Sequence, residues 1–281
     1  MSSVSRSVSR SVSRSILAGQ SNTLASIIKS LFANNEQGFA YDLNDLTTMF
    51  QDAAGTVPVT GAGQPVGLIR DKSGRNNHAS QTTSASRPIL QRNATTGAYY
   101  LAFDGTDDFL SVPKTNMKFL HNGSGASIFV GYTPLSSVYH TILNTGNIGN
   151  ASVVGAAIAQ DDRVGNSSIF NIVSNGSGTL HINSIIPTGI STASRVVTVK
   201  NITGSHIVRL NAIQMVSSST EAGMASQTES TNDLWIGRAP AGFPMRGRIY
   251  SLIGISRITT DAETKALEKL IAKNTGVALS V

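Results

Sequence analysis

Three acidic residues lie close together in the stretch FDGTDDF, namely Asp104, Asp107 and Asp108. Several carboxylate oxygens on one short loop are the ligands that Ca²⁺ prefers, so the three residues form a candidate calcium site. The same residues also suit a tight turn at Gly105, in which carboxylates accept hydrogen bonds from backbone N–H groups. Because no further acidic cluster lies near them in the sequence, we expect the turn, and we predict no cofactor apart from this one candidate ion.

The sequence contains no pair of potential catalytic residues at a spacing that is typical of an active site. His78, in GRNNHAS, is a candidate metal ligand or general base, but it has no Cys or His partner at ligand spacing. Glycoside hydrolysis needs two carboxylates that face one groove, and no pair at a suitable spacing is found. The sequence also contains no G-x-S-x-G, P-loop or Rossmann fingerprint. We therefore predict no catalytic residues and a protein that is not an enzyme.

Aromatic residues are the second group with possible chemistry. Glycan-binding proteins use exposed rings beside polar groups, and the candidates here are Tyr99, Tyr132 and Trp235. Each of them also fits a purely structural role, because Trp235 in DLWIGR alternates as a core strand residue would, and Tyr99 adjoins the strand-like run LAFDG. The sequence therefore leaves a sugar-binding surface and a buried core as alternatives.

The pattern between residues 39 and 255 predicts a chain built from strands. About a dozen short runs rich in Val, Ile, Phe and Tyr are separated by clusters of Gly, Asn, Ser and Asp. No helical pattern interrupts them, which predicts an all-β fold with two antiparallel sheets packed face to face. A polar stretch from Ser217 to Asp233 predicts a long surface loop. The chain contains no cysteine, which excludes disulfides and thiolate chemistry.

Helical signals flank this region. Apolar residues with helical spacing predict a short amphipathic helix from about Thr23 to Ala33, which either packs on the sandwich or associates with a second copy. Near the C-terminus, Thr260 and Glu263 form a capping box and Gly276 marks the end of a longer helix. The apolar face expected for this second helix consists of Ala262, Ala266, Leu267, Leu270 and Ile271.

Several motifs resemble those of laminin G-like domains, which have the concanavalin A-like lectin/glucanase fold. LAFDGTDDFLSVP resembles the F-D-G-x-D-D signature of these domains, and DKSGRNNHAS resembles a segment that precedes it. VRLNAI lies where the family has a Y-V-N-G hairpin, and since Ala212 replaces the glycine, a looser turn or another turn type is expected. Together with the C-terminal helix, the order of these motifs resembles laminin G-like proteins carried by tailed bacteriophages.

This resemblance covers roughly residues 39–279. It implies a two-sheet antiparallel jelly-roll sandwich, to which the sequence adds an N-terminal arm and the two helices. We predict three parts, consisting of a Ser/Val/Arg repeat arm over 1–15, a short amphipathic helix and linker over 16–35, and the sandwich with its C-terminal helix over 36–281. Many proteins of this fold bind Ca²⁺, which is the second reason to test the three aspartates.

The first part repeats the tetrapeptide S-V-S-R. Such a segment has too little apolar surface to fold alone, so we predict a docking arm that becomes ordered only on a partner. Valine side chains would fill shallow pockets and arginine side chains would meet acidic groups. The predicted docking residues are Val4, Arg6, Val8, Arg10, Val12 and Arg14.

The resemblance implies a bacteriophage virion structural protein, as a head decoration protein, a head fibre or a tail-associated fibre component. Its expected partners are other virion proteins and further copies of itself, and its expected location is the virion, assembled in the bacterial cytoplasm. The alternative is a carbohydrate-binding, lectin-like protein that recognises host surface glycans. Half of the formal charge of +6 comes from the three arm arginines, so no specific nucleic-acid binding is expected. No run is long enough to predict membrane insertion.

Overall fold

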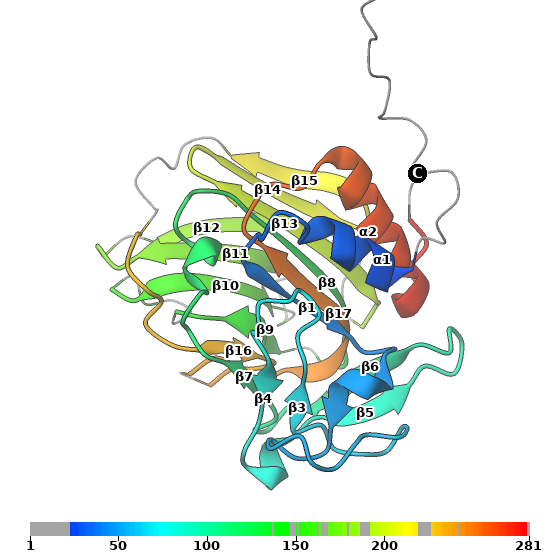
Figure 1. Ribbon diagram of the computed structural model, residues 1–281. Coiled ribbons are helices and arrows are strands. Elements are labelled where there is room, and N and C mark those ends of the chain that lie inside the picture. Colours follow the sequence, from blue (N-terminus) through cyan, green and yellow to red (C-terminus); the bar gives the residue numbers. More distant parts are fainter. Residues whose placement is uncertain are drawn as a thin grey trace, which may run out of the picture.

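The computed structural model describes residues 23–136, 138–146, 150, 152–161, 163, 168–178, 180–185, 192–218, 226–240 and 242–279. These residues form two antiparallel sheets and two α-helices (Figure 1), as the sequence predicts. Three short 3-10 helices lie between strands, at Leu46–Thr48, Ser84–Ser86 and Lys118–Leu120. Among the described residues, no helix is long and apolar enough to cross a membrane.

The first sheet, called sheet A below, has eight strands in the order β15-β14-β13-β8-β17-β6-β5, with β1 paired to β17. Its longest strand, β17, contacts β8, β6 and β1 in antiparallel register. The strands of sheet A are β1 (Gly38–Asp42), β5 (Ile89–Arg92), β6 (Tyr99–Asp104), β8 (Ala126–Pro134), β13 (Arg195–Ile202), β14 (Ser205–Leu210), β15 (Ile213–Ser218) and β17 (Arg246–Ile255).

The second sheet, called sheet B, has nine strands in the order β12-β11-β10-β9-β16-β7-β4-β3-β2. A register shift between Ile158 and Ala159 marks an irregularity where β10 pairs with β9. The strands of sheet B are β2 (Met49–Phe50), β3 (Leu68–Ile69), β4 (Ala79–Ser80), β7 (Leu110–Val112), β9 (Tyr139–Asn144), β10 (Val154–Asp161), β11 (Ser168–Asn175), β12 (Leu180–Ile185) and β16 (Leu234–Ile236).

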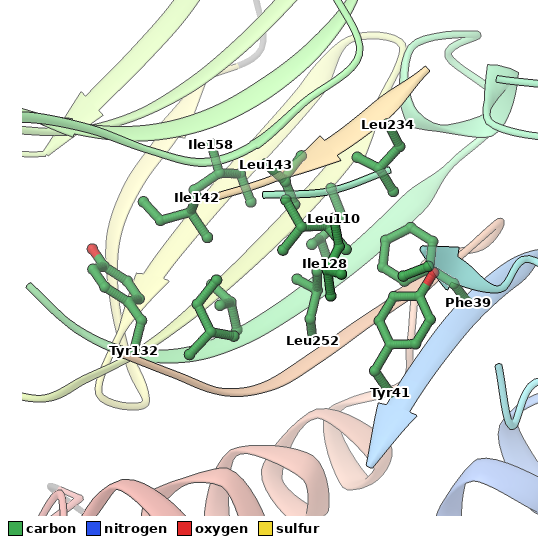
Figure 2. Close-up of a cluster of buried hydrophobic side chains, with 14 of the residues drawn as sticks. Phe39, Tyr41, Leu110, Ile128, Tyr132, Ile142, Leu143, Ile158, Leu234 and Leu252 are labelled. Atoms are coloured by element: carbon green, nitrogen blue, oxygen red, sulfur yellow. The ribbon is translucent and has the colours of Figure 1, made fainter. Parts of the chain in front are cut away.

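The main core fills the space between the two sheets. Figure 2 shows side chains from both sheets meeting there, with Phe39 and Tyr41 at one end of the cluster and Tyr132 at the other. Phe39 and Tyr41 stack with ring centroids 5.5 Å apart. The face-to-face arrangement buries alternate residues of each strand, which is why period-two sequence patterns locate the strands.

A second core lies on the outer face of sheet A, under the two helices. Helix α1 (Leu24–Leu31) and helix α2 (Asp261–Thr275) lie side by side on this face (Figure 1). Ile28 and Leu31 of α1 and Ile271 of α2 pack with sheet residues in one buried cluster. Of the two alternatives for the first helix, the structure therefore shows packing on the sandwich.

The ends of α2 agree with the sequence, whereas its buried face does not. The Thr260 side chain accepts the Glu263 N–H and the Glu263 side chain binds back, and Gly276 follows in the left-handed region at φ 78°. The predicted apolar face is wrong in part, because Ala262 is exposed and Leu270 is half-buried. The buried side chains are Thr264, Leu267, Glu268, Ile271, Ala272 and Thr275. Sheet A supplies the partners of Glu268, whereas the Thr264 and Thr275 hydroxyls donate to carbonyls of the helix and its N-cap.

Two further predictions are refined by the structure. The hairpin between β14 and β15 keeps a two-residue turn with positive φ at both Asn211 (50°) and Ala212 (71°), so alanine has not loosened it, although this backbone region favours glycine. In the predicted surface loop, β15 continues to Ser218, and residues 219–225 lie outside the described part. After them, the chain is anchored by the hydrogen bond from the Ser226 N–H to the His121 carbonyl (3.1 Å).

Candidate functional site

The outer face of sheet B is the broad surface to which the described part of the chain adds no α-helix. Both helices pack on sheet A. In β16, Leu234 and Ile236 point into the main core, so Trp235 between them points outward. The register shift between β9 and β10 brings both Thr141 and Asn144 of β9 to this outer face, opposite Ala159 and Ala157 of β10 respectively.

Trp235 belongs to a stacked aromatic pair on this face. Its ring lies 4.5 Å from that of Phe109, with an interplanar angle of 18°, and both side chains are half-buried. The guanidinium of Arg238 lies 6.0 Å from the Phe109 ring centroid. Phe109, Trp235 and Arg238 are called the Trp235 cluster below. The interpretation of Trp235 as a core residue is therefore wrong, because the strand places its two aliphatic neighbours inward.

A second aromatic group, the Tyr139 cluster, lies on the same sheet. Tyr139 stacks on Phe170 of β11 at 6.0 Å and meets Phe243 at 5.0 Å. Arg163 lies 5.8 Å from the Tyr139 ring and makes an ion pair with Asp161 at 2.7 Å. Burial, aided by the Asp161 carboxylate, raises the pKa of Tyr139 to about 12, so its hydroxyl stays a hydrogen-bond donor at neutral pH.

Two buried polar side chains of β9 lie on the sheet face between these clusters. Asn144 pairs with Trp235 on one side and with Ala157 on the other. Within the described part of the chain, both amide atoms of Asn144 and the hydroxyl of Thr141 are buried and have no hydrogen-bond partner. An unpaired buried polar group costs about 1–3 kcal/mol, so a water or a bound molecule is needed to satisfy these atoms.

The other two aromatic candidates do not join this surface. Tyr132 is fully buried between the sheets and donates a hydrogen bond to Gln160 at 2.5 Å, so its prediction as a glycan contact is wrong. Every residue of β8 is buried, and the Tyr132 side chain lies on the face that meets the main core. Tyr99 is half-buried on sheet A, where Arg92 lies 5.7 Å from its ring.

The three aspartates do converge, as their spacing predicts. Each offers a carboxylate oxygen within 4.8 Å of the others. Protein donors already use these oxygens, since Asp108 accepts the Asp104 N–H (2.9 Å) and Asp104 accepts the Thr106 N–H (2.7 Å). Ser86 donates to Asp107 at 2.5 Å. This arrangement fits the predicted turn, while calcium binding stays a prediction.

The buried carboxyl of Asp108 allows the role of charge in this turn to be tested by varying the pH. Burial, with repulsion from Asp104 and Asp107, raises the pKa of Asp108 from 3.8 to about 6. Between these two values the folded state holds more protons than the unfolded state, so this group adds stability as the pH falls through that window. Asp108→Asn keeps an acceptor without the charge, and we expect it to stabilise the protein by about 1–2 kcal/mol at pH 7 and to flatten the pH dependence, measured by urea unfolding.

Adding EDTA or CaCl₂ in the same unfolding assay distinguishes a bound calcium ion from a turn that hydrogen bonds alone stabilise. If the turn alone is present, neither reagent shifts the unfolding midpoint of the wild type. If calcium binds, CaCl₂ should stabilise the wild type, and Asp108→Asn should abolish this effect. The variant should then also be less stable than the wild type at pH 7. Asp104, which is exposed, is the matched control position.

The segment DKSGRNNH has a structural role in the described fold. Asp71 accepts hydrogen bonds from the N–H groups of Ala40 (2.8 Å), Ser73 (2.8 Å) and Asn77 (3.1 Å), which ties the segment to β1. His78 Nδ1 accepts the Asp71 N–H at 3.0 Å, so its imidazole closes the same turn. This turn was not predicted, although an Asp two residues before a Ser-Gly pair is a sequence signal for it.

The architecture described above is that of a two-sheet antiparallel β-sandwich, and comparison with solved structures agrees. A structure of botulinum neurotoxin type C, whose cell entry is described as dependent on two ganglioside molecules, has a TM-score of 0.55 at 12% identity, covering 89% of this chain and 53% of that one. The serotype D ligand-binding domain with N-acetylneuraminic acid has a TM-score of 0.54 at 13% identity, covering 86% and 52%. No protein-family model and no curated protein matches the sequence.

At these identities the likeness establishes the fold. The chain spans about half the length of these neurotoxin structures, which are receptor- or ligand-binding domains and not catalytic ones. The predicted two-sheet sandwich is confirmed, and the non-enzymatic expectation agrees with the neighbours. The laminin G-like assignment finds no support in the comparisons. The docking arm lies outside the described residues, and the three-part division and the virion location stay predictions.

Proposed function

We propose that this protein is a carbohydrate-binding module and that the outer face of sheet B is its binding surface. The observation that carries this proposal is the pair of aromatic clusters, each with an arginine, on the face that no described α-helix covers. Structures of the same fold in complex with SialylT (TM-score 0.54, 11% identity) and with N-acetylneuraminic acid add support from fold similarity alone. Because only about half of each neighbour is matched, the proposal depends on the residues of this chain.

The chemistry of the surface suits a sugar ring. A pyranose has an apolar C–H face that stacks on an aromatic ring and polar hydroxyls at its edge, and the Trp235 cluster places such a ring next to Asn144. The Asn144 amide beside Trp235 is fully buried, so its two polar atoms are not exposed to a sugar in this structure. Arg238 Nε also lacks a partner within the described chain, and it adds positive charge beside the rings.

Trp235→Ala is the direct test of this proposal. Truncating a central aromatic contact typically costs more than 1–2 kcal/mol of binding energy, so we expect a loss of affinity of about tenfold or more for any glycan that the wild type binds. A glycan array with the full chain identifies the ligand, and isothermal titration calorimetry measures the change. Circular dichroism confirms that the variant is folded.

Tyr99→Ala is the matched control, because Tyr99 is also half-buried beside an arginine but lies on sheet A. We expect this variant to bind as the wild type does. The proposal fails if the wild type binds no glycan at millimolar concentration, or if Tyr99→Ala lowers affinity as much as Trp235→Ala does.

The predicted virion role is not in conflict with glycan binding. It depends on the repeat arm over residues 1–15, which lies outside the described part of the chain. A sandwich that faces outward from a particle would be free to contact host surface sugars, so the two roles can coexist in one protein.

A further inference from the structure

One end of the main core is polar and contains a buried arginine. Arg195 starts β13, pairs with Tyr132 of β8, and is 3% exposed. Its position alternates with Val196, which packs under the helices, so the Arg195 side chain points between the sheets. Figure 2 shows this end of the core at Tyr132, far from Phe39 and Tyr41.

Among the described residues, Arg195 has no acidic counterpart. Nη1 donates to the Oε1 atom of Gln160, which is neutral and also accepts the Tyr132 hydroxyl. Nη2 is buried without a hydrogen-bond partner, and no ion pair joins Arg195 to a carboxylate among the described residues. The Tyr132 ring, 5.9 Å away, offers a weak cation–π contact. Asp161, next to Gln160, points to the opposite face and pairs with Arg163.

Apart from Asp161, which pairs with Arg163, the described groups at this end offer donors and no negative charge. His140 pairs with Gln160 across the strands. Its Nδ1 accepts the Arg246 N–H (3.3 Å) and its Nε2 donates to the Ser136 carbonyl (2.8 Å), which assigns the ring proton to Nε2. The Ser136 hydroxyl is buried and unpartnered in the described chain. A buried guanidinium in such surroundings is costly unless a negative charge joins it.

We propose that Arg195 is the centre of an internal oxyanion-binding site, in which Nη2 donates to an oxygen of a carboxylate, sulfate or phosphate. Guanidinium groups bind these oxyanions through charge-assisted N–H donors, and the low polarity of the core strengthens the interaction. The ligand supplies the charge and the acceptor that the protein lacks. This site lies between the sheets, so it is independent of glycan binding on the outer face of sheet B.

The test is a thermal-unfolding titration of the full chain with sodium sulfate, phosphate, acetate and chloride at constant ionic strength. A ligand that binds only the folded state raises Tm as its concentration passes Kd, and we expect a saturating rise of about 3 °C or more for at least one oxyanion. The rise should be absent in Arg195→Gln. Arg92→Gln, which removes an exposed arginine, is the matched control and should respond as the wild type does.

General salt effects differ from specific binding in the shape of the Tm titration curve, because sulfate and phosphate stabilise most proteins without saturation at high concentration. Equal Tm responses in the wild type and Arg195→Gln, or no saturating response in the wild type, would overturn the proposal. Should Arg195→Gln fail to fold, Arg195→Lys retains the charge without the fork of donors, and we expect a weakened, shifted titration. The comparison of anions identifies which oxyanion the site prefers.

Discussion

Replacing Arg209 by alanine is expected to lower the free energy of unfolding by about 3–5 kcal/mol. Glu268 of α2 is 1% exposed, and its carboxylate accepts hydrogen bonds from Arg209 Nε (2.8 Å) and Nη2 (3.1 Å) and from the Thr198 hydroxyl (2.9 Å). Without Arg209 this charge stays buried beneath the helix without its partner. Urea unfolding at pH 7 measures the loss.

A double variant separates the loss of this partner from a general packing defect. The double variant Arg209→Met/Glu268→Leu should recover most of the loss, because apolar side chains of similar size often replace a buried ion pair without penalty.

The matched control is Arg257, which pairs with Glu36 (3.2 Å) and Glu263 (2.6 Å) at the edge of the same helix but is 28% exposed. Its ion pair lowers the pKa of Glu263 to about 2. Exposed pairs contribute little because water screens them, so Arg257→Ala should cost about 1 kcal/mol. Similar losses for Arg209→Ala and Arg257→Ala would contradict the assignment of Glu268 as the buried anchor of the helix.

Leu267→Ala is expected to cost about 3–4 kcal/mol, the second large effect. Leu267 is fully buried in the second core with Phe129 and Ile253 of sheet A, so truncation leaves a cavity that the sheet is unable to fill. Leu270→Ala removes the same atoms from a half-buried position of the same helix and should cost about 1 kcal/mol. Both are measured by urea unfolding, and equal losses would mean that the face predicted from the sequence is the buried one.

Local patterns were sufficient for several parts of this fold. The capping box at Thr260 and the turn at Asp104 join residues at most four positions apart, so their partners are visible in any short window of sequence. The β-hairpin at Asn211 differs, because it was expected from the resemblance with a looser or different turn, whereas the structure has a two-residue turn. The capping box and the aspartate turn depend on backbone chemistry that the flanking structure does not change.

The candidate site was predicted only in part, because its residues come from strands that are far apart in the sequence and adjacent in the sheet. Trp235 was named, but its partner Phe109 is 126 positions earlier in the chain (235 minus 109), and the two meet through pairing of β16 with β7. Asn144 gave no signal, since an asparagine near a Gly-Asn turn looks like any loop residue until β9 brings it opposite Trp235. Tyr132 looked as accessible as Trp235, because nothing in its own strand reveals that its side chain points between the two sheets.

By itself, the sequence determined the all-β class, the two helices with their ends, the aspartate turn and the lack of catalytic pairing. Each of these follows from spacing or residue type within a short segment. Only the tertiary structure decided which face of sheet A the helices cover, that α2 turns Glu268 and not Leu270 inward, and that Arg195 is buried with no acidic partner among the described residues. The reason is that burial and charge pairing are set by contacts between residues far apart in the chain, such as Arg209 and Glu268 at a separation of 59 residues.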